Sequence, residues 1–498
     1  MFANNLSLVI WAPIVAGLLV LATGGDQRAT LARWLALAGA LVGFLVSLPL
    51  FTEFNNLHGG MQFVEKMPWI ESLGINYHLG VDGISMLFIV LNSFTTLMVV
   101  LAGWEVIQKR TAQYMAAFLI MSGLINGAFA ALDAILFYVF FEGMLIPMYL
   151  IIGVWGGPRR VYASVKFFLY TLLGSLLMLV AFIYLYFQAG KTFDIAAFQS
   201  LVKIPREVQI LLFIAFFLSF AVKVPMWPVH TWLPDAHVEA PTGGSMVLAA
   251  ITLKIGAYGF LRFALPIAPV ASLLLAPVIV VMSLVAVVYI GLVALVQTDM
   301  KKLVAYSSIS HMGFVTLGMF LFTGSSLNAW ALEGALVQMV SHGFVSAAMF
   351  FCIGVMYDRV HSRNIADYGG VANKMPIFAA FMMLFAMANS GLPATSGFVG
   401  EFMVIMGAVQ VNFWVAALAA TTLIFGAAYT LWMYKRVIFG DIGNDHVAEL
   451  SDVNKREFLV LAILALAVLG MGLYPQAFVE KMHLSVNDLI AHVAISKL

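Results

Sequence analysis

The chain has 498 residues, of which 63% are hydrophobic and 10% are charged, and its formal net charge is +1. A typical soluble protein is about 45–50% apolar and about 25% charged, so this chain lacks the polar residues to cover a water-exposed surface. The composition therefore predicts a polytopic membrane protein in contact with lipid. The near-zero net charge excludes a nucleic-acid partner, which would need a strongly basic face.

The hydropathy pattern predicts an all-α fold with about fourteen membrane-spanning helices, because each span needs about 20 mostly apolar residues. No basic segment precedes the first span, so we expect a retained helix and not a cleaved signal sequence. The tail 476–498 is weakly amphipathic and is expected at the membrane surface. In chain order the expected spans lie at 6–23, 31–51, 83–103, 113–131, 134–155, 164–188, 208–230, 241–262, 270–297, 302–323, 329–356, 376–407, 411–438 and 457–475.

The basic residues fall mainly on one side of this arrangement. Sixteen of the 25 Lys and Arg residues lie in loops after odd-numbered spans, and seven lie in loops after even-numbered spans or in the C-terminal tail. Basic loops stay on the cytoplasmic or matrix side of a membrane. We therefore expect both termini on the opposite side. The two remaining cations, Lys223 and Lys254, lie inside predicted spans.

Two charged residues lie near the middle of uninterrupted spans. Glu142 is nine residues beyond Asp133 and so lies about 13 Å along its helix. Lys254 lies in the middle of the eighth span. A charge at the bilayer centre costs at least about 2.5–3.5 kcal/mol, so such a residue usually faces the interior of the helix bundle and serves a function.

Two further charges lie where a span is interrupted. Lys223 precedes Pro225 and Pro228 in the seventh span, and proline lacks the N–H that would continue a helix. Glu401 follows the segment 389–397, whose sequence NSGLPATSG interrupts the twelfth span. The seventh and twelfth helices are therefore expected to be discontinuous. Transporters place ion sites at such breaks, where irregular backbone lines a cavity.

These four charges have two interpretations. They could be structural ion pairs that hold helices together, or they could form a proton path. A buried Glu–Lys pair that opens and closes changes its proton affinity, because burial and pairing shift a pKa in opposite directions. We favour the proton path, with Glu142, Lys223, Lys254 and Glu401 as the proton-transfer residues, since two of them lie at helix breaks.

Histidines on apolar spans are candidates for proton relay. His311 and His342 could pass protons between the charged residues, or each could be a core histidine bonded to a backbone carbonyl. His230 and His237 follow the break in the seventh span, and their spacing does not fit a zinc motif. We therefore expect no metal site.

The remaining acids and the single thiol are given structural roles. Asp235 and Glu239 are expected at the mouth of the cavity, and Asp82 and Asp133 fall at span starts, where an acid suits a helix N-terminus. Cys352 alone cannot bind an iron–sulfur cluster, which needs about four thiolates. No nucleotide-binding motif occurs. We expect no cofactor on this chain.

The two helix breaks also predict an internal repeat. They lie five spans apart, and five is odd, so five-helix units made of spans 4–8 and 9–13 would have opposite topology. We expect a three-helix N-terminal segment at 1–110, a first half at 111–265 and a second half at 266–440. The last span and an interfacial tail then occupy 441–498.

Several long stretches of the chain are distinctive: GVDGISMLFIVLN, FFEGMLIPMYLIIGVWGG, FAVKVPMWPVHTWLPDAHVEAPTGGS, QTDMKKLVAYSSISHMGF and GLPATSGFVGEF. They resemble the antiporter-like membrane subunits of proton-pumping NADH:quinone oxidoreductase, respiratory complex I. The resemblance covers nearly the whole chain. Within this family, the acid Glu401 and the early end after GLYPQAF distinguish the chain from the sister chains L and N.

The resemblance implies a role for each candidate residue. Glu142 and Lys223 would form the Glu–Lys pair of a first half-channel, Lys254 would link the halves, and Glu401 would end the second half-channel. Three histidines would lie along this hydrated axis or near the first half-channel: His311, His342 and His230. Glu239 stands where related chains often carry a neutral residue, so the resemblance assigns it no role.

The resemblance also implies partners and a location. NADH, FMN, iron–sulfur clusters and ubiquinone would be handled by partner subunits, and chains L and N and membrane lipid would be neighbours. The basic loops resemble those of bacterial chains, which implies the bacterial inner membrane with both termini periplasmic, in preference to the mitochondrial inner membrane. The alternatives are a subunit of a multisubunit Na+/H+ antiporter, a solute carrier and a membrane scaffold.

Overall fold

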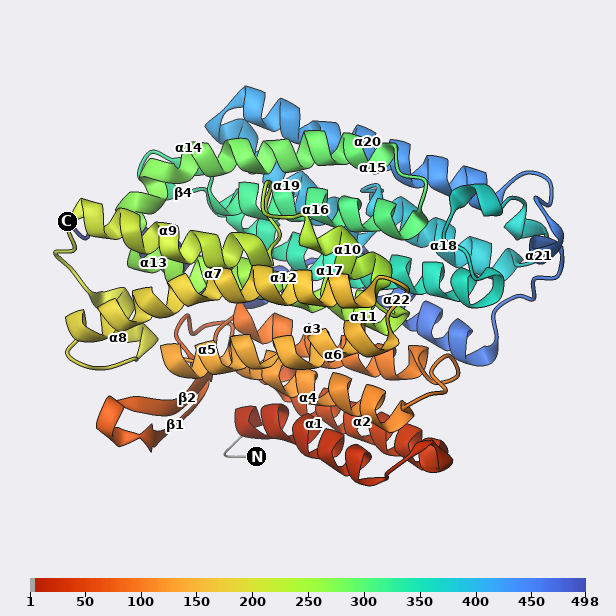
Figure 1. The fold of residues 1–498 in the computed structure, drawn as a ribbon. Coiled ribbons are helices and arrows are strands. Elements are labelled where there is room, and N and C mark those ends of the chain that lie inside the picture. The colour runs from red at the N-terminus through yellow and green to blue at the C-terminus, as the bar shows by residue number, and fades with distance from the viewer. Residues whose placement is uncertain (1–4) are drawn as a thin grey trace.

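The structure is a computed structural model that describes residues 5–498 and consists almost entirely of helices lying alongside one another (Figure 1). Apolar runs form helices here because a helix satisfies its own backbone N–H and C=O groups, as a bilayer interior requires. The α-helices and the π-helical turns are α1 (Asn5–Ala22), α2 (Ala29–Thr52), α3 (Ser85–Ala102), α4 (Thr111–Ala130), α5 (Ala134–Gly143), α6 (Leu145–Trp155), α7 (Arg160–Gln188), α8 (Ile195–Ser200), α9 (Arg206–Lys223), α10 (Trp232–Glu239), α11 (Thr242–Val247), η3 (Leu248–Thr252), α12 (Leu253–Gly259), η4 (Phe260–Ala264), α13 (Leu265–Ile267), α14 (Pro269–Val285), η5 (Ala286–Ile290), α15 (Gly291–Leu295), α16 (Met300–Met319), α17 (Ala329–Val360), α18 (Pro376–Asn389), α19 (Ser396–Val411), α20 (Phe413–Ile438), α21 (Asp445–Ala448), α22 (Lys455–Leu473) and α23 (Gln476–Val493). Two antiparallel hairpins pair β1 (Gln62–Ile70) with β2 (Ile75–Val81) and β3 (Phe322–Thr323) with β4 (Ser326–Leu327).

The predicted all-α membrane fold is confirmed, but the predicted count of fourteen spans is not. A helix or a group of helices lies at each predicted position. Within residues 5–498, eleven helices are long and apolar enough to cross a membrane, or up to twelve if the bent pair Ile365–Asn373 and Pro376–Asn389 is one span. The other helices fall short because α9 carries three charges, α16 is too polar, and α18 and α19 are shortened by a break.

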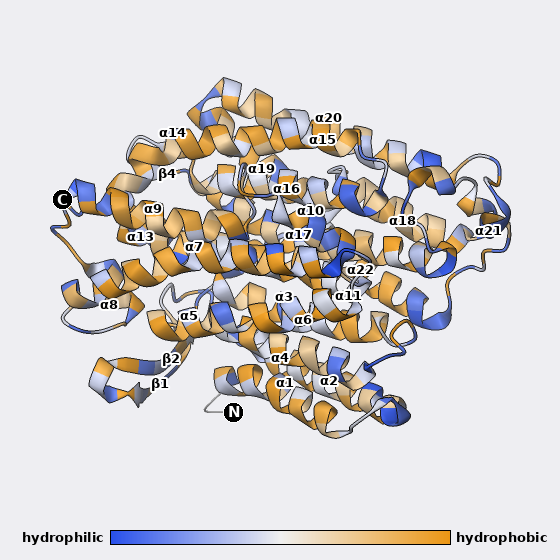
Figure 2. Ribbon diagram, in the orientation of Figure 1, coloured by the Kyte–Doolittle hydropathy of each residue, from blue (hydrophilic) through white to orange (hydrophobic). Residues whose placement is uncertain are grey.

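The helices divide into a peripheral set and a central set. In an apolar stretch of 18 residues, 28% of the residues are buried in α2 and 33% in α20. In the corresponding stretches of Thr242–Ile267 and of α17, all of the residues are buried. Large exposed apolar side chains such as Trp34, Leu173 and Ile424 lie on peripheral helices. Figure 2 shows hydrophobic residues along the helix bodies and hydrophilic residues toward several helix ends. A continuous apolar surface of this kind needs lipid around it.

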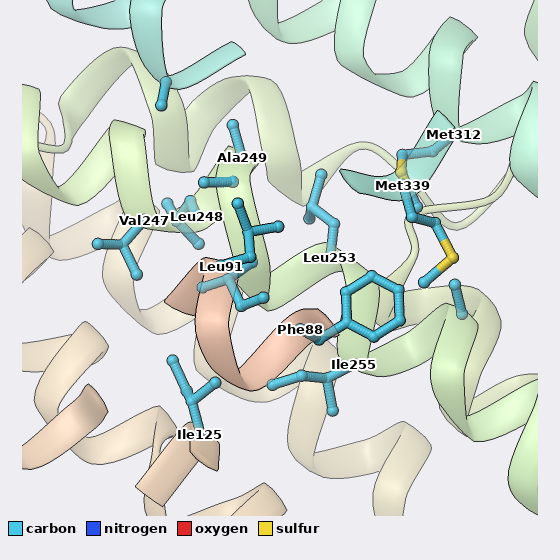
Figure 3. Close-up of a cluster of buried hydrophobic side chains, with 14 of the residues drawn as sticks. Phe88, Leu91, Ile125, Val247, Leu248, Ala249, Leu253, Ile255, Met312 and Met339 are labelled. Atoms are coloured by element: carbon cyan, nitrogen blue, oxygen red, sulfur yellow. The ribbon is translucent and has the colours of Figure 1, made fainter. Parts of the chain in front are cut away.

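The centre of the bundle is packed with aliphatic and sulfur-containing side chains. Figure 3 shows Phe88 and Leu91 of α3 beside Leu253 and Ile255 of α12, all of them buried. The eighth span is not a regular helix, because the π-helical turns η3 and η4 flank α12. The hydrophobic periodicity did not indicate these turns, because one wider turn changes the spacing of the apolar residues very little.

The two acids predicted to serve helix N-termini do so. The Asp133 carboxylate accepts hydrogen bonds from the N–H groups of Ile135 and Leu136 at 3.0 and 3.1 Å, which caps α5. Asp82 accepts from the Ser85 N–H at 2.9 Å ahead of α3 and also pairs with Arg262 at 2.7 Å. Such caps satisfy backbone donors that have no partner within the helix.

The seventh and twelfth predicted spans are both discontinuous, as the prolines and the polar segment indicated. Helix α9 ends at Lys223, and the chain resumes helical structure only at α10. Helix α18 ends at Asn389, and α19 begins at Ser396. A third interruption, at Met144 between α5 and α6, lies two residues after Glu142 and was not predicted.

The C-terminal helix α23 joins three parts of the chain. Its His483 Nδ1 lies 2.5 Å from the Glu333 carboxylate on α17. Ser485 Oγ accepts a hydrogen bond from the Gly83 N–H, ahead of α3, at 2.9 Å. His492 Nε2, near the end of the helix, donates to the Gln199 carbonyl of α8 at 2.9 Å. The helix therefore joins α17, the segment ahead of α3 and α8.

The Asp194 carboxylate contacts both strands of the first hairpin, and removal of its charge should loosen that hairpin. The Asp194 carboxylate caps α8 and lies 3.3 Å from Lys66 Nζ and 3.2 Å from His78 Nδ1. Burial disfavours its charge, but His78, Lys66 and the Ala196 N–H outweigh burial and lower the pKa of Asp194 to about 2. Because the folded pKa lies below the ordinary value, this stabilisation is present at neutral pH and is lost as the pH falls from about 4 toward 2.

We therefore expect Asp194→Asn to speed amide hydrogen exchange in β1 and β2 by about tenfold at neutral pH, as for loss of a charge-assisted hydrogen bond. Hydrogen-exchange mass spectrometry of the detergent-solubilised protein measures this rate. Glu71→Gln, which changes an exposed acid in the hairpin turn, is the matched control. Equal exchange in both variants would contradict the prediction.

Candidate functional site: a buried row of ionisable side chains

Lys254 lies in the middle of the bundle against a histidine predicted as a relay residue. Its Nζ is 2.7 Å from Nδ1 of His342 on α17, and both side chains are buried. Lys254 Nζ also donates to the carbonyl of Ala249, which lies in the π-helical turn η3 directly before α12. Such turns are frequent at functional sites. The ammonium is thus held by one imidazole and one carbonyl, both of which are neutral acceptors.

A second contact joins His311 to Glu401. The Glu401 Oε1 atom is 2.9 Å from His311 Nδ1, although these residues lie on α19 and α16. Gln338 on α17 donates from Nε2 to the same carboxylate oxygen at 3.3 Å. Gln338 was not predicted, because a single amide on an apolar span gives no signal of its partner. The buried acid therefore has one imidazole and one amide as partners.

The two contacts lie next to each other. The ring centroids of His311 and His342 are 5.7 Å apart, and within the described residues neither Nε2 atom has a hydrogen-bond partner. A cavity of about 10 Å³ is lined by both histidines, Gln338 and Glu401. That volume is close to the space one water molecule needs. Lys254, His342, His311 and Glu401 therefore form one buried series, which we call the Lys254–Glu401 row.

The break between α18 and α19 positions the acid end of this row. Gly391 lies in the break with a φ of +79°, a conformation that favours glycine. A Cβ atom there would lie 2.8 Å from Glu401 Oε2. Asn389, at the end of α18, donates to Ser307 Oγ at 3.1 Å and so fixes α18 to α16. The sequence interruption thus serves to fit the backbone closely around a buried carboxylate.

Glu142 and Lys223, which the resemblance implied to be a pair that opens and closes, interact electrostatically but make no direct ion pair in this structure. Lys223 Nζ lies 5.3 Å from the Phe141 ring centroid and 5.6 Å from that of Phe167. Glu142 lies beside Ser175, and its Oε1 has no hydrogen-bond partner among residues 5–498. Aromatic faces attract cations, so they compete with the carboxylate for the ammonium. The two charges interact at longer range.

Lys223 nevertheless reaches the helix that carries Lys254. A Cβ atom on Gly256 would lie 2.9 Å from Cβ of Lys223 and 2.9 Å from the Phe220 carbonyl oxygen. Glycine at this position therefore allows α9 and α12 to touch at the end of α9. Gly256 is two residues from Lys254, so the two lysines lie on directly contacting helices.

His230 lies apart from the Lys254–Glu401 row. It is buried in the chain break after α9, and its Nδ1 has no hydrogen-bond partner in the described part of the chain. Close by, Lys166 Nζ pairs with Asp235 at 2.6 Å. The structure therefore places His230 beside a charged pair that joins α7 to the first turn of α10.

His237 was not predicted to take part, but the structure places it near the row. Its side chain is fully buried, stacks on Phe350 with ring centroids 4.4 Å apart, and interacts electrostatically with Lys254. Glu239, two residues further on, accepts a hydrogen bond from the Arg159 N–H at 2.9 Å. Glu239 also lines a cavity of about 270 Å³ together with Lys301 and Arg363.

No group of three His, Cys, Asp or Glu residues within 5–498 is arranged to hold a metal ion. Cys352 is a buried, free cysteine. The Lys254–Glu401 row brings amine, imidazole and carboxylate groups within hydrogen-bonding distance of one another, so it can transfer protons between nitrogen and oxygen atoms.

Comparison with known proteins relates this arrangement to a family. Residues 131–426 match the family model described as NADH:quinone oxidoreductase/Mrp antiporter, transmembrane. The chain is 50% identical to NADH-quinone oxidoreductase subunit M of Rhodobacter capsulatus over 98% of its own length and 96% of that protein. It is 46% identical to NADH-ubiquinone oxidoreductase chain 4 of Marchantia polymorpha, over 99% of this chain and 98% of that one.

A solved structure has the same fold. A chain of respiratory complex I from Thermus thermophilus with bound NADH superposes with a TM-score of 0.89 and 31% sequence identity. The match covers 98% of this chain and 99% of that chain. Both the sequence relatives and the structural relative therefore match this chain over almost their full length.

Proposed function

The chain belongs to the NADH:quinone oxidoreductase/Mrp antiporter transmembrane family, and from this premise we propose that it is a proton-translocating subunit of the membrane arm of respiratory complex I. Relatives over almost its whole length bear the names subunit M and chain 4, which agrees with the expected difference from chains L and N. As part of a translocase, it would couple NADH oxidation and ubiquinone reduction on other subunits to proton transfer across the membrane.

The observation that carries the proposal is the Lys254–Glu401 row. Lys254 Nζ can give a proton to His342 Nδ1, and the imidazole can release a proton from Nε2 toward His311. His311 Nδ1 then faces the Glu401 carboxylate, which can accept the proton. Imidazole suits this relay because one nitrogen can accept a proton as the other releases one.

Glu142 and Lys223 would supply protons to this row. Lys223 lies on a helix that touches α12, and its charge interacts at a distance with Glu142. A perturbation from quinone reduction elsewhere in the complex would change the Glu142–Lys223 separation, so that Lys223 gives up a proton toward Lys254. His230 would assist near the first half. Glu401 would then pass the proton to the far side of the membrane.

The remaining assignments follow from the same proposal. The neighbours would be other complex I subunits, including the antiporter-like chains L and N, with lipid elsewhere. NADH, FMN, iron–sulfur clusters and ubiquinone would be bound by partner subunits. The sidedness of the basic loops supports both termini on the outer side of the membrane. That side would be the periplasm, since the resemblance favours the bacterial inner membrane. The two halves, 111–265 and 266–440, would act as two connected half-channels.

The assembly is tested by gentle solubilisation of membranes that contain this chain. We expect the chain to migrate with NADH dehydrogenase activity in a complex far larger than its own 54.3 kDa. The second candidate function, a subunit of a multisubunit Na+/H+ antiporter, is favoured by the family description, which names Mrp antiporters as well. Migration in a large complex without NADH dehydrogenase activity would favour that candidate.

Removal of the first acid should disable proton transfer in the assembled complex. Glu142→Gln keeps the size of the side chain but removes the charge that interacts with Lys223, so we expect proton pumping with NADH to fall by about tenfold or more. Proton uptake into sealed vesicles, followed with a pH-sensitive dye, measures the effect. Glu53→Gln is the control, because this acid is exposed directly after α2. Normal pumping by an assembled Glu142→Gln complex would contradict the role.

A further inference from the structure

An apolar groove of about 320 Å³ lies between the peripheral helices α2, α22 and α23 on one side and the buried helices α3 and α17 on the other. Every residue that lines it is apolar or glycine. The walls come from α2, α3, α17, α22 and α23, and include Phe44, Phe51, Phe94, Phe344, Gly470 and Phe478. Its volume is at the lower end of the range for small-molecule sites, about 300–1,000 Å³.

The groove lies in one half of the membrane thickness and is open at its side. Phe44 and Phe51 lie in the last turns of α2 and are seven residues, or about 10 Å, apart along the helix. Leu466, on the lip of the groove, is 71% exposed. A Cβ atom on Gly470 would meet nothing within 4 Å, so this glycine leaves open space in the wall. The groove is thus a slot that extends about 10 Å along α2 and opens toward lipid.

A cation lies at the end of the groove nearest α23. Lys481 Nζ is 5.2 Å from the ring centroid of Phe51, which lines the groove, and 6.0 Å from that of Phe54. Among residues 5–498, no carboxylate lies within the 4.0 Å of an ion pair to Lys481, whereas ten such pairs occur elsewhere. An apolar slot that ends at an unpaired ammonium matches an amphiphile with an anionic head.

We propose that this groove binds one acyl chain of an anionic phospholipid from the leaflet on the side of α23, with the phosphate at Lys481. A neighbouring transmembrane helix is about 10–12 Å in diameter with its side chains and does not fit a slot of this volume, whereas an extended hydrocarbon chain does. Each buried methylene adds about 0.8 kcal/mol. Lys481 adds selectivity for a negatively charged head group.

The test uses the intact complex in nanodiscs of phosphatidylcholine with a minority of phosphatidylglycerol that carries a diazirine in its acyl chain. After illumination, we expect the lipid to label peptides that contain Phe44–Phe51 and Leu466–Phe478. Gly470→Phe fills the open space in the wall and should reduce this labelling by about tenfold. Leu473→Phe, an equally large side chain on an exposed position of the same helix, should leave the labelling unchanged.

The head-group contact is tested separately. Lys481→Gln should lower labelling by phosphatidylglycerol by about fivefold, the effect of one cation near an anionic lipid. Labelling by a phosphatidylcholine probe with the same diazirine chain should stay unchanged. Equal labelling of all lipid-facing helices would overturn the proposal, as would labelling that survives in Gly470→Phe. A photo-crosslink from the groove to a neighbouring subunit in place of lipid would overturn it as well.

Discussion

A Lys254→Met complex should assemble normally and pump protons about tenfold or more slowly than the unaltered complex with NADH as donor. Methionine fills nearly the same volume as the aliphatic part of lysine, but it cannot release or accept a proton. It would leave His342 without the proton donor that now lies 2.7 Å from its Nδ1. Loss of one positioned acid–base group typically costs a rate factor of at least about a hundred, and water can replace part of that loss.

Pumping and electron transfer should be measured on the same vesicles. If the two are tightly coupled, NADH-driven quinone reduction should fall together with proton uptake. Lys302→Met makes the same substitution at an exposed lysine of α16 and serves as the control. If a Lys254→Met complex of normal size pumped protons at the wild-type rate, the row would not be part of the proton path.

Glu401→Gln should give a loss of similar size for a different reason. Glutamine keeps the shape of the side chain, and its carbonyl can still accept the hydrogen bond from Gln338. It cannot take up a proton at the site that now lies 2.9 Å from His311 Nδ1. We therefore expect proton uptake by vesicles to fall by about tenfold or more, with the fold around the row preserved.

Glu401→Asp separates titration from position. Aspartate can still be protonated, but its carboxylate lies one methylene further from His311, so intermediate activity is expected. Glu449→Gln, at an exposed acid outside the membrane helices, is the matched control. If Glu401→Gln and Glu401→Asp lowered pumping equally, a change of shape and not loss of the proton site would explain the effect.

The sequence alone located the buried charges and the helix breaks better than it predicted which side chains meet. Glu142, Lys223, Lys254 and Glu401 were selected because each is a charge in an apolar span, and that signal is local. The helix breaks next to Lys223 and Glu401 were equally local, since proline and glycine act on their own backbone. These features lie where expected in the structure.

The contacts could not be predicted because they depend on packing between distant segments. Lys254 and His342 are 88 positions apart, and Gln338 and Glu401 are 63 apart. The resemblance implied a Glu142–Lys223 pair, but it could not show that the rings of Phe141 and Phe167 lie around the Lys223 ammonium. His237 was overlooked because its importance comes from its neighbours on other helices, which a spacing pattern does not contain.

The attachment of α23 has a consequence for the kind of motion that transport can use. Its contacts with Glu333, Gly83 and the Gln199 carbonyl connect α17, the segment ahead of α3 and α8. Many secondary transporters work by alternating access, in which one repeat rocks as a rigid body against the other. Such rocking would have to break these contacts in every cycle. The fold is therefore suited to a static frame, inside which water and side chains rearrange while the helices stay in place.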